Sequence, residues 1–244
     1  MSPSPLVTIP AMIKRIIPAI ATRGRILSML AFGFVPVILG FFINRADNDR
    51  RRGGEPDPAE LLSGFSLTIF LPLVVLVFAS ATLGTLREER TLVYFWLRPI
   101  GRWQITVAAL LSAWIVLLPL VLIPTVAFAA VVGDGTDVAG AIAASLVGTV
   151  AYGALFTVFG LVTQRSLVWG LVYILVWEGF VGGLSQLAGR FSVRSYTRSL
   201  LGRITDVNVI DAPEAIATII IVTVGVAVVS LGVSTLMLNR MDVD

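Results

Sequence analysis

The sequence predicts an all-α membrane protein, and two features of its composition predict this fold class. Of its 244 residues, 57% are hydrophobic and only 14% are charged, and the mean hydropathy is +0.93. A soluble domain of this length cannot bury so much apolar surface in one core. The few charges gather in short clusters between long apolar stretches, as a multi-spanning chain requires, because a charge inside the hydrocarbon is costly.

Six apolar stretches are each near or above the length of about 20 residues that a bilayer requires. We predict six transmembrane helices, all in a single transmembrane domain over 1–244, at 26–43, 65–86, 105–132, 137–163, 166–187 and 214–238. An even number of spans places both termini on the same side. In the fourth span, Gly140, Ala144 and Gly148 recur every four residues, which predicts a close approach of another helix.

An N-terminal interfacial amphipathic helix is predicted within 12–25. Four isoleucines fall on one side of this helix and two cations on the other, namely Ile13, Ile16, Ile17 and Ile20 against Lys14 and Arg15. A solvated, partly ordered tail is the alternative interpretation. The basic N-terminus favours cytoplasmic termini, a cytoplasmic 87–104 segment and outer segments at 44–64 and 188–213.

The residue types that are missing exclude several kinds of chemistry. The chain has no cysteine, no histidine and one lysine, Lys14. Disulfides, Cys or His metal sites and Ser/His or Cys/His catalysis are therefore excluded. No phosphate-binding loop of the G-x-x-x-x-G-K-[ST] kind is present, so we expect neither an enzyme nor a bound nucleotide, cofactor or metal. The net charge of +3 fits anionic lipid headgroups better than nucleic acid.

The segment between spans two and three combines charges with aromatic residues. It reads REERTLVYFWLRPIGRW over 87–103. In a helix, Arg87, Arg90, Thr91 and Tyr94 would share one face, and the helix would end before Pro99. An interfacial helix on lipid phosphates would explain the arginines, but the two adjacent acids, Glu88 and Glu89, disfavour an anionic surface. Mixed charge beside aromatics suits a protein partner better.

This segment resembles the ABC-2 type permeases, the membrane subunits of a class of ABC transporters. The matching residues of REERTLVYFWLRPIGRWQI are Glu88, Glu89, Thr91, Leu92, Tyr94, Arg98, Pro99 and Arg102. The segment LVWEGFVGGL followed by FSVRSYTRSL is also similar to this family, as is the order of elements. Two positions depart from its pattern, since Arg90 replaces a common glycine and an early lysine of span three is absent.

The resemblance implies that the 87–104 segment couples this chain to a separate cytoplasmic ABC ATPase subunit, present in two copies that carry the ATP and Mg. The implied coupling residues are Arg87, Glu88, Glu89, Arg90, Thr91, Tyr94, Arg98, Pro99 and Arg102. A second permease subunit, identical or related, would pair with this one in the plasma membrane of a prokaryote, and the complex would be an exporter. The alternative is a non-transporting polytopic assembly or signalling subunit of such a complex.

One acid lies well inside a predicted span, and this is Glu178. An intramembrane carboxylate is a functional candidate by default. It would line a substrate path, bond to a neighbouring helix, or sit in a wet vestibule if Gly179, Gly182 and Gly183 break the span. We favour the hydrogen-bonding role.

A short outer helical segment is predicted between spans five and six, where arginines recur every four residues. Arg190, Arg194 and Arg198 would form one basic stripe, opposite an apolar side. A lipid-facing anchor at the outer interface is the favoured interpretation. The sequence GDGTD at 133–137 is too short for a calcium loop and predicts a tight outer turn.

Overall fold

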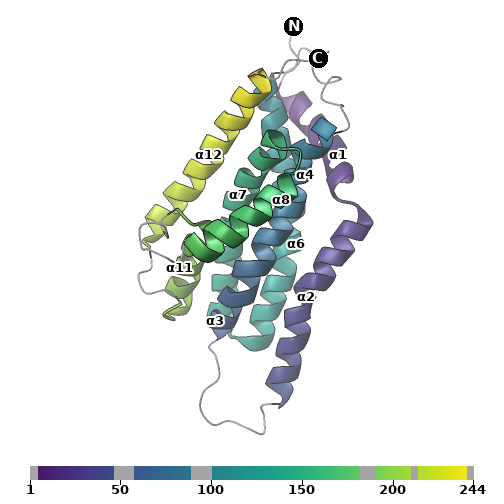
Figure 1. Ribbon diagram of the computed structural model, residues 1–244. Coiled ribbons are helices and arrows are strands. Elements are labelled where there is room, and N and C mark those ends of the chain that lie inside the picture. Colours follow the sequence, from purple (N-terminus) through teal and green to yellow (C-terminus); the bar gives the residue numbers. More distant parts are fainter. Residues whose placement is uncertain are drawn as a thin grey trace.

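The computed structural model describes residues 5–46, 58–88, 101–181, 189, 191–209 and 214–240, and within these ranges it is helical with no strand. Most helices run along one common axis and form a bundle (Figure 1). Their bounds are α1 Pro5–Ile20, α2 Arg23–Ala46, α3 Pro58–Leu61, η2 Leu62–Phe70, α4 Leu71–Glu88, α6 Arg102–Val132, α7 Gly135–Val162, α8 Ser166–Val172, η3 Tyr173–Val181, α11 Val193–Thr205 and α12 Ile216–Arg240. The all-α prediction is confirmed.

Within the described residues, five helices are long and apolar enough to cross a membrane. They are Arg23–Phe42 within α2, Pro58–Gly84 across α3, η2 and α4, then α6, α7 and α12. These five contain the predicted spans 26–43, 105–132, 137–163 and 214–238 almost completely, and 65–86 lies inside the continuous stretch that ends with α4. Helix bounds differ from the predictions by a few residues, mostly because the helices extend into polar flanking residues.

Of the remaining predicted span, 166–187, the structure describes residues 166–181. Helices α8 and η3 form one apolar stretch of 7 and 9 residues that ends at Val181, and 182–188 lie outside the described residues. Sixteen residues would extend about 24 Å, less than the roughly 30 Å of the hydrocarbon. This stretch crosses the bundle obliquely over α4 and α7 (Figure 1). A complete sixth span therefore stays a prediction.

Helix α7 lies at the centre of the bundle, packed against α4, α6, α11 and α12. Its small residues permit this close packing. A Cβ atom on Gly140 would meet Leu201 Cδ1 at 2.8 Å, and one on Gly148 would meet Thr197 Cγ2 at 2.9 Å. The predicted close approach is confirmed: α11 approaches at both glycines, and Leu71 of α4 also approaches Gly148.

The N-terminal helix α1 begins earlier than predicted, at Pro5, and ends at Ile20. The basic residues at 23 and 25 belong instead to the first turn of α2. The buried side of α1 consists of residues four apart, namely Thr8, Met12, Ile16 and Ile20, while Lys14 and Arg15 are exposed. This side packs on Leu83 of α4, Ile105 of α6 and Leu238 of α12. The predicted amphipathic helix is therefore present, and its apolar side contacts protein.

The turn between α6 and α7 is built by two aspartates. Asp134 is the N-cap of α7 and accepts hydrogen bonds from the backbone N–H of Thr136 (2.7 Å) and of Asp137 (3.2 Å). Asp137 Oδ2 accepts in return from the Asp134 N–H at 3.0 Å. The Thr136 hydroxyl and these two N–H groups hold the pKa of Asp134 below its ordinary value. The predicted tight turn is thus a reciprocal cap of α7.

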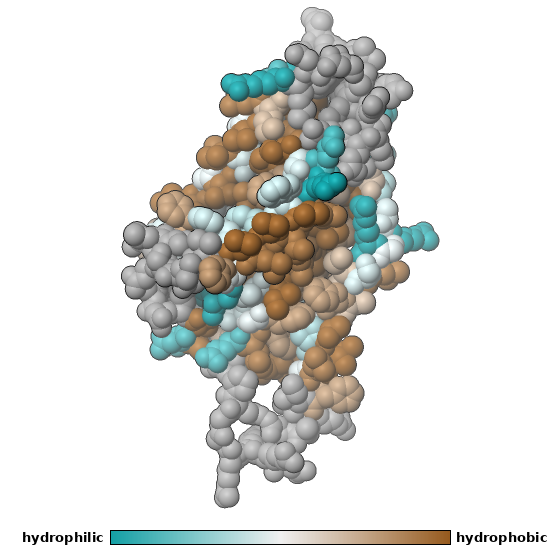
Figure 2. All heavy atoms as spheres, viewed as in Figure 1, coloured by the Kyte–Doolittle hydropathy of each residue, from teal (hydrophilic) through white to brown (hydrophobic). Residues whose placement is uncertain are grey.

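The outer surface of the bundle is strongly apolar. Figure 2 shows an apolar area at its centre, where α8 and η3 lie. This area includes large exposed side chains, among them Leu167, Val168, Trp169, Leu175 and Phe180. Helix α12 likewise exposes Ile220, Ile221, Val224, Val228 and Val229. Such surface is compatible with insertion in a membrane, where lipid chains cover it.

Candidate functional site

The predicted coupling segment lies at one end of the bundle, between the last residue of α4 and the first of α6. Arg87 and Glu88 form the end of α4, and Arg102 begins α6. The other coupling residues fall outside the described part of the chain, namely Glu89, Arg90, Thr91, Tyr94, Arg98 and Pro99. Helix α1 begins and α12 ends at this same end of the molecule (Figure 1).

Arg102 points toward α12 within the same chain. Its Nη1 donates a hydrogen bond to the backbone oxygen of Leu238 at 2.6 Å, two residues before α12 ends at Arg240. The last carbonyls of a helix lack intrahelical partners and carry partial negative charge, so a guanidinium is favourable there. Arg102, for which the resemblance implies contact with a partner, therefore also joins the start of α6 to the end of α12.

Glu178 lies in η3, and only 4% of its surface is exposed. Its Oε1 accepts hydrogen bonds from Tyr173 Oη at 2.9 Å and from the Val193 N–H at 3.0 Å. Its Oε2 accepts from Ser192 Oγ and from the Arg194 N–H at 3.3 Å. Since Ser192 is the N-cap of α11, the Glu178 carboxylate closes the beginning of that helix.

This position supplies what a helix start requires. The first N–H groups of a helix have no intrahelical acceptor, and the helix dipole favours negative charge there. Four donors occupy the two oxygens of Glu178, about as many as a carboxylate accepts. A cationic ligand would have to displace these donors. The contacts therefore favour the hydrogen-bonding interpretation of Glu178 over direct contact with a cargo, and the burial of its side chain disfavours the wet vestibule.

The hydrogen bond from Tyr173 depends on the π-helical form of η3. In a π-helix each backbone bond reaches five residues back, and Tyr173 and Glu178 are five residues apart. The same spacing appears in η2, where Thr68 Oγ1 donates to the Ser63 oxygen at 2.6 Å. The sequence does not predict the Tyr173–Glu178 pair, because an α-helix brings together residues three or four apart and these two are five apart.

An aromatic group joins this cluster to the central helix. Tyr152 of α7 stacks on Phe156 with ring centroids 5.6 Å apart, and Phe156 meets Tyr173 edge-on at 6.0 Å. The Tyr152 hydroxyl is fully buried close to Glu178 but outside hydrogen-bonding geometry, and it has no hydrogen-bond partner among the described residues. Two sequence signals point to the partners of Glu178. Ser192 is a good N-cap residue before an apolar-periodic run, and tyrosine is rare in this chain.

The arginines of α11 contact neighbouring segments. Arg194 Nη1 donates to the backbone oxygen of Glu178 at 3.3 Å, and Arg198 Nη2 donates to that of Val209 at 3.1 Å. Burial, followed by the charge of Arg194, lowers the pKa of Arg198 from its ordinary value. Arg190 lies outside the described residues. The apolar side of α11 packs through Tyr196 and Leu200 on α7 and α12, so protein covers much of the side that was predicted to face lipid.

No protein-family model matches this chain, and no curated protein matches it either. Within the part of the chain that the structure describes, no three Asp, Glu, His or Cys side chains gather in a way that would hold a metal ion. The functional interpretation therefore depends on the residues and their contacts.

Proposed function

We propose that this chain is the transmembrane permease subunit of an ATP-driven ABC transporter, an exporter that is coupled through its 87–104 segment to a separate ATPase subunit. The observation that carries the proposal is the segment REERTLVYFWLRPIGRW, which joins α4 to α6. It resembles the coupling element of the ABC-2 permeases. Its combination of both charge signs with aromatic residues is typical of a protein-binding surface.

The surroundings of this segment support a mechanical role for it. The ends of α4, α6, α7 and α12 meet α1 in one apolar cluster that includes Ile16, Leu83, Ile105, Leu161 and Leu238. Arg102 adds a hydrogen bond between α6 and α12 at this end. A force applied to the 87–104 segment would therefore reach several helices at once, because packed helices move together rather than deform.

The energy source in this proposal is a partner. Two cytoplasmic ABC ATPase subunits would carry ATP and Mg, and a second permease subunit, identical or related, would complete the membrane part. We place both termini and 87–104 in the cytoplasm of a prokaryote, with α8, η3 and 182–187 completing a sixth span of the plasma membrane. The basic residues of α1 support a cytoplasmic N-terminus, and the six predicted spans would place the C-terminus on the same side.

Orientation is tested first, because the chain has no native cysteine. A single cysteine introduced at Asn48 should react with a membrane-impermeant maleimide from outside intact cells, and one introduced at Ser4 should react only after the cells are opened. Labelling of the Asn48 position from the cytoplasmic side alone would contradict the proposed orientation.

The coupling role is tested with a double variant, Glu89→Ala with Arg98→Ala. It should insert normally but lose copurification with its ATPase and lose transport in liposomes, because interface charges set encounter and register. The matched control is Glu60→Ala with Arg203→Ala, which removes the same two charges elsewhere. Full ATPase association and full transport by the first variant would contradict the coupling role. ATPase association without any cargo-stimulated ATP hydrolysis in the wild type would favour the non-transporting subunit.

A further inference from the structure

Two arginines of α11 lie one helical turn apart, and neither forms an ion pair with a carboxylate among the described residues. Arg194 and Arg198 are both partly buried, and each donates a hydrogen bond to a backbone carbonyl of a flanking segment. The nearby carboxylate of Glu178 already accepts four hydrogen bonds, and Arg194 reaches it with its backbone N–H.

Arg198 also has an unused donor inside the protein. Its Nε atom is buried and has no hydrogen-bond partner among the residues that the structure describes. The lowered pKa of Arg198, caused by burial and by the charge of Arg194, shows that this environment disfavours the cation. A partly buried charge is normally paired, and an unpaired buried donor requires an explanation such as an absent ion.

The donor geometry indicates which chemistry would satisfy this site. Guanidinium groups present several N–H donors in a plane and match the oxygens of phosphate groups, often with two hydrogen bonds each. Two guanidiniums one turn apart together match one phosphate group, whose charge would also remove their mutual repulsion. Carbonyl oxygens already take one donor from each arginine, which fixes the two side chains in place.

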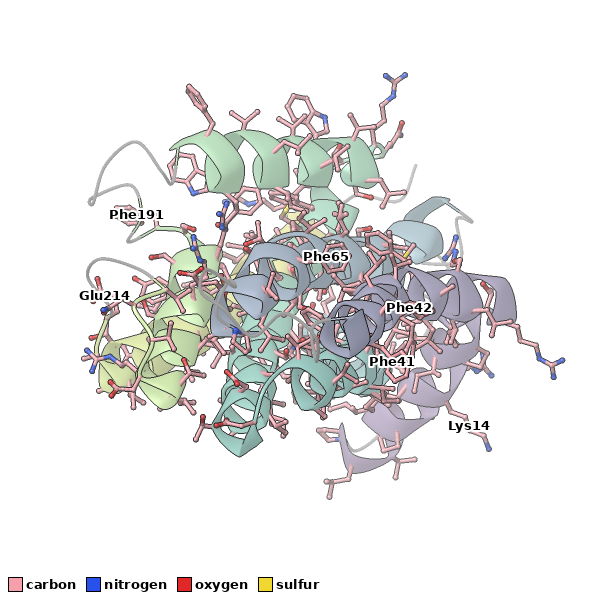
Figure 3. The ribbon with its side chains drawn as sticks, turned by 90° about the horizontal axis from the view of Figure 1, so that it is seen from below. Lys14, Phe41, Phe42, Phe65, Phe191 and Glu214 are labelled. Atoms are coloured by element: carbon pink, nitrogen blue, oxygen red, sulfur yellow. The ribbon has the colours of Figure 1, made fainter. Side chains whose placement is uncertain are left out.

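We propose that Arg194 and Arg198 bind one phosphate group, either of a membrane phospholipid or of free phosphate. The surface beside the pair favours the lipid, since Phe191 is 75% exposed directly before α11 and Ile216 is 49% exposed at the start of α12. Figure 3 shows Phe191 and Glu214, which flank α11 in the chain, on the same side of the molecule and away from Lys14. This site is independent of the proposed transport function.

The test uses the full-length chain in detergent and native mass spectrometry. Phosphatidylglycerol is titrated against the wild type and Arg198→Gln, and diacylglycerol with the same acyl chains serves as the probe without phosphate. Arg198→Gln should weaken binding of one phosphatidylglycerol about tenfold, the effect expected from the loss of a charge-assisted hydrogen bond. The matched control is Arg203→Gln, which removes an exposed charge from the same helix and should leave this binding unchanged.

The source of the phosphate is decided by competition. Displacement of the lipid by millimolar inorganic phosphate assigns the site to the phosphate group alone, and persistence of the lipid assigns it to the phospholipid as a whole. Equal binding by wild type and Arg198→Gln, or equal binding of diacylglycerol and phosphatidylglycerol, would overturn the proposal.

A second measurement covers the case in which Arg198→Gln does not fold. Phenylglyoxal modifies accessible arginines, and peptide mass spectrometry locates the product in the wild-type chain. Phosphatidylglycerol should protect Arg198 and Arg194 from modification and should leave Arg203 reactive. Equal modification of Arg198 with and without the lipid and with and without inorganic phosphate would overturn the site.

Discussion

Helices α7 and α12 are both long and apolar, yet they occupy opposite environments. In their most apolar stretches, 56% of the α7 residues are buried but only 22% of the α12 residues. Helix α7 has glycines at close contacts with its neighbours, such as Gly148 and Gly160, whereas α12 presents β-branched side chains such as Ile220 and Val228 outward. In lipid, apolar surface gains little from leaving the solvent, so small size rather than hydropathy decides which helix becomes central.

The largest expected effect comes from a glycine at the contact between α7 and α4. A Cβ on Gly160 would overlap the backbone oxygen of Ser80, which cannot rotate away. Gly160→Leu should therefore destabilise the chain by more than about 3 kcal/mol, since overpacking forces backbones apart. In α12, Gly232 has nothing within 4 Å of such a Cβ, so Gly232→Leu should be neutral or slightly stabilising.

Unfolding in mixed detergent micelles, followed by circular dichroism, measures both glycine variants. Equal destabilisation by Gly160→Leu and Gly232→Leu would show that α7 and α12 are packed alike. That result would contradict the inference that small residues make α7 the central helix.

The next effect concerns the Glu178 cluster, which joins η3 and α11 beside α7. Glu178→Leu leaves the Tyr173 and Ser192 hydroxyls and two backbone N–H groups without an acceptor, which should cost about 3 kcal/mol. Glu178→Gln keeps one carbonyl oxygen, and the Ser192 hydroxyl is able to accept from its amide. It should cost about 1 kcal/mol, mainly through the Arg194 N–H.

The same unfolding titration ranks the Glu178 variants. The expected order of stability is wild type, then Gln, then Leu. Hydrogen exchange should show the loss at the first turn of α11 before any other helix. If Glu178→Leu is as stable as the wild type, the carboxylate does not hold α11.

A smaller effect is expected from Arg102, which holds the end of α12, the less buried of helices α7 and α12. Arg102→Gln removes the charged donor to the Leu238 oxygen and should cost about 1 kcal/mol. Hydrogen exchange should increase in the last turn of α12 and stay unchanged in α7. Arg240→Gln, an exposed charge at the same end, is the control and should change neither helix.

The smallest effect is expected at the N-cap of α7. Asp134→Ala removes the acceptor of the Thr136 and Asp137 N–H groups and should lower the thermal midpoint slightly, while Asp134→Asn should retain most of the cap. The pKa of Asp134 is depressed in the folded chain, so its contribution is present above the unfolded value and is lost as the pH falls through the folded one. The wild type should thus lose more stability than Asp134→Ala on acidification below about pH 4.

Much of this fold follows from the sequence because hydrophobic length and rare charges are strong signals in a membrane protein. The five long helices and the close contact at Gly140 and Gly148 are of this kind. Glu178 was recognised because a carboxylate is rare in an apolar run. Its donors were missed, since Ser192 lies 14 residues away and Tyr173 pairs with it only in a π-helix.

The oblique path of α8 and η3 across the bundle was not predictable either. An apolar run at 166–187 has the composition of a span, and composition does not specify whether the helix runs along the bundle or crosses it. The path over α4 and α7 is set by tertiary contacts, such as Gly170 against Leu76. The part of the coupling segment at 89–100 lies outside the described residues, so its predicted helix remains a prediction.

The π-helical form of η3 has a consequence for how this chain tolerates a change of length. A π-turn holds one residue more than an α-turn, so it absorbs a single-residue insertion without shifting the helix beyond it. Removal of one residue between Tyr173 and Glu178 would place them four apart, which is the spacing that shares a face in an α-helix. The tyrosine–carboxylate pair would thus survive the deletion. A one-residue gap at 175 or 176, where both side chains are exposed, would therefore keep this contact.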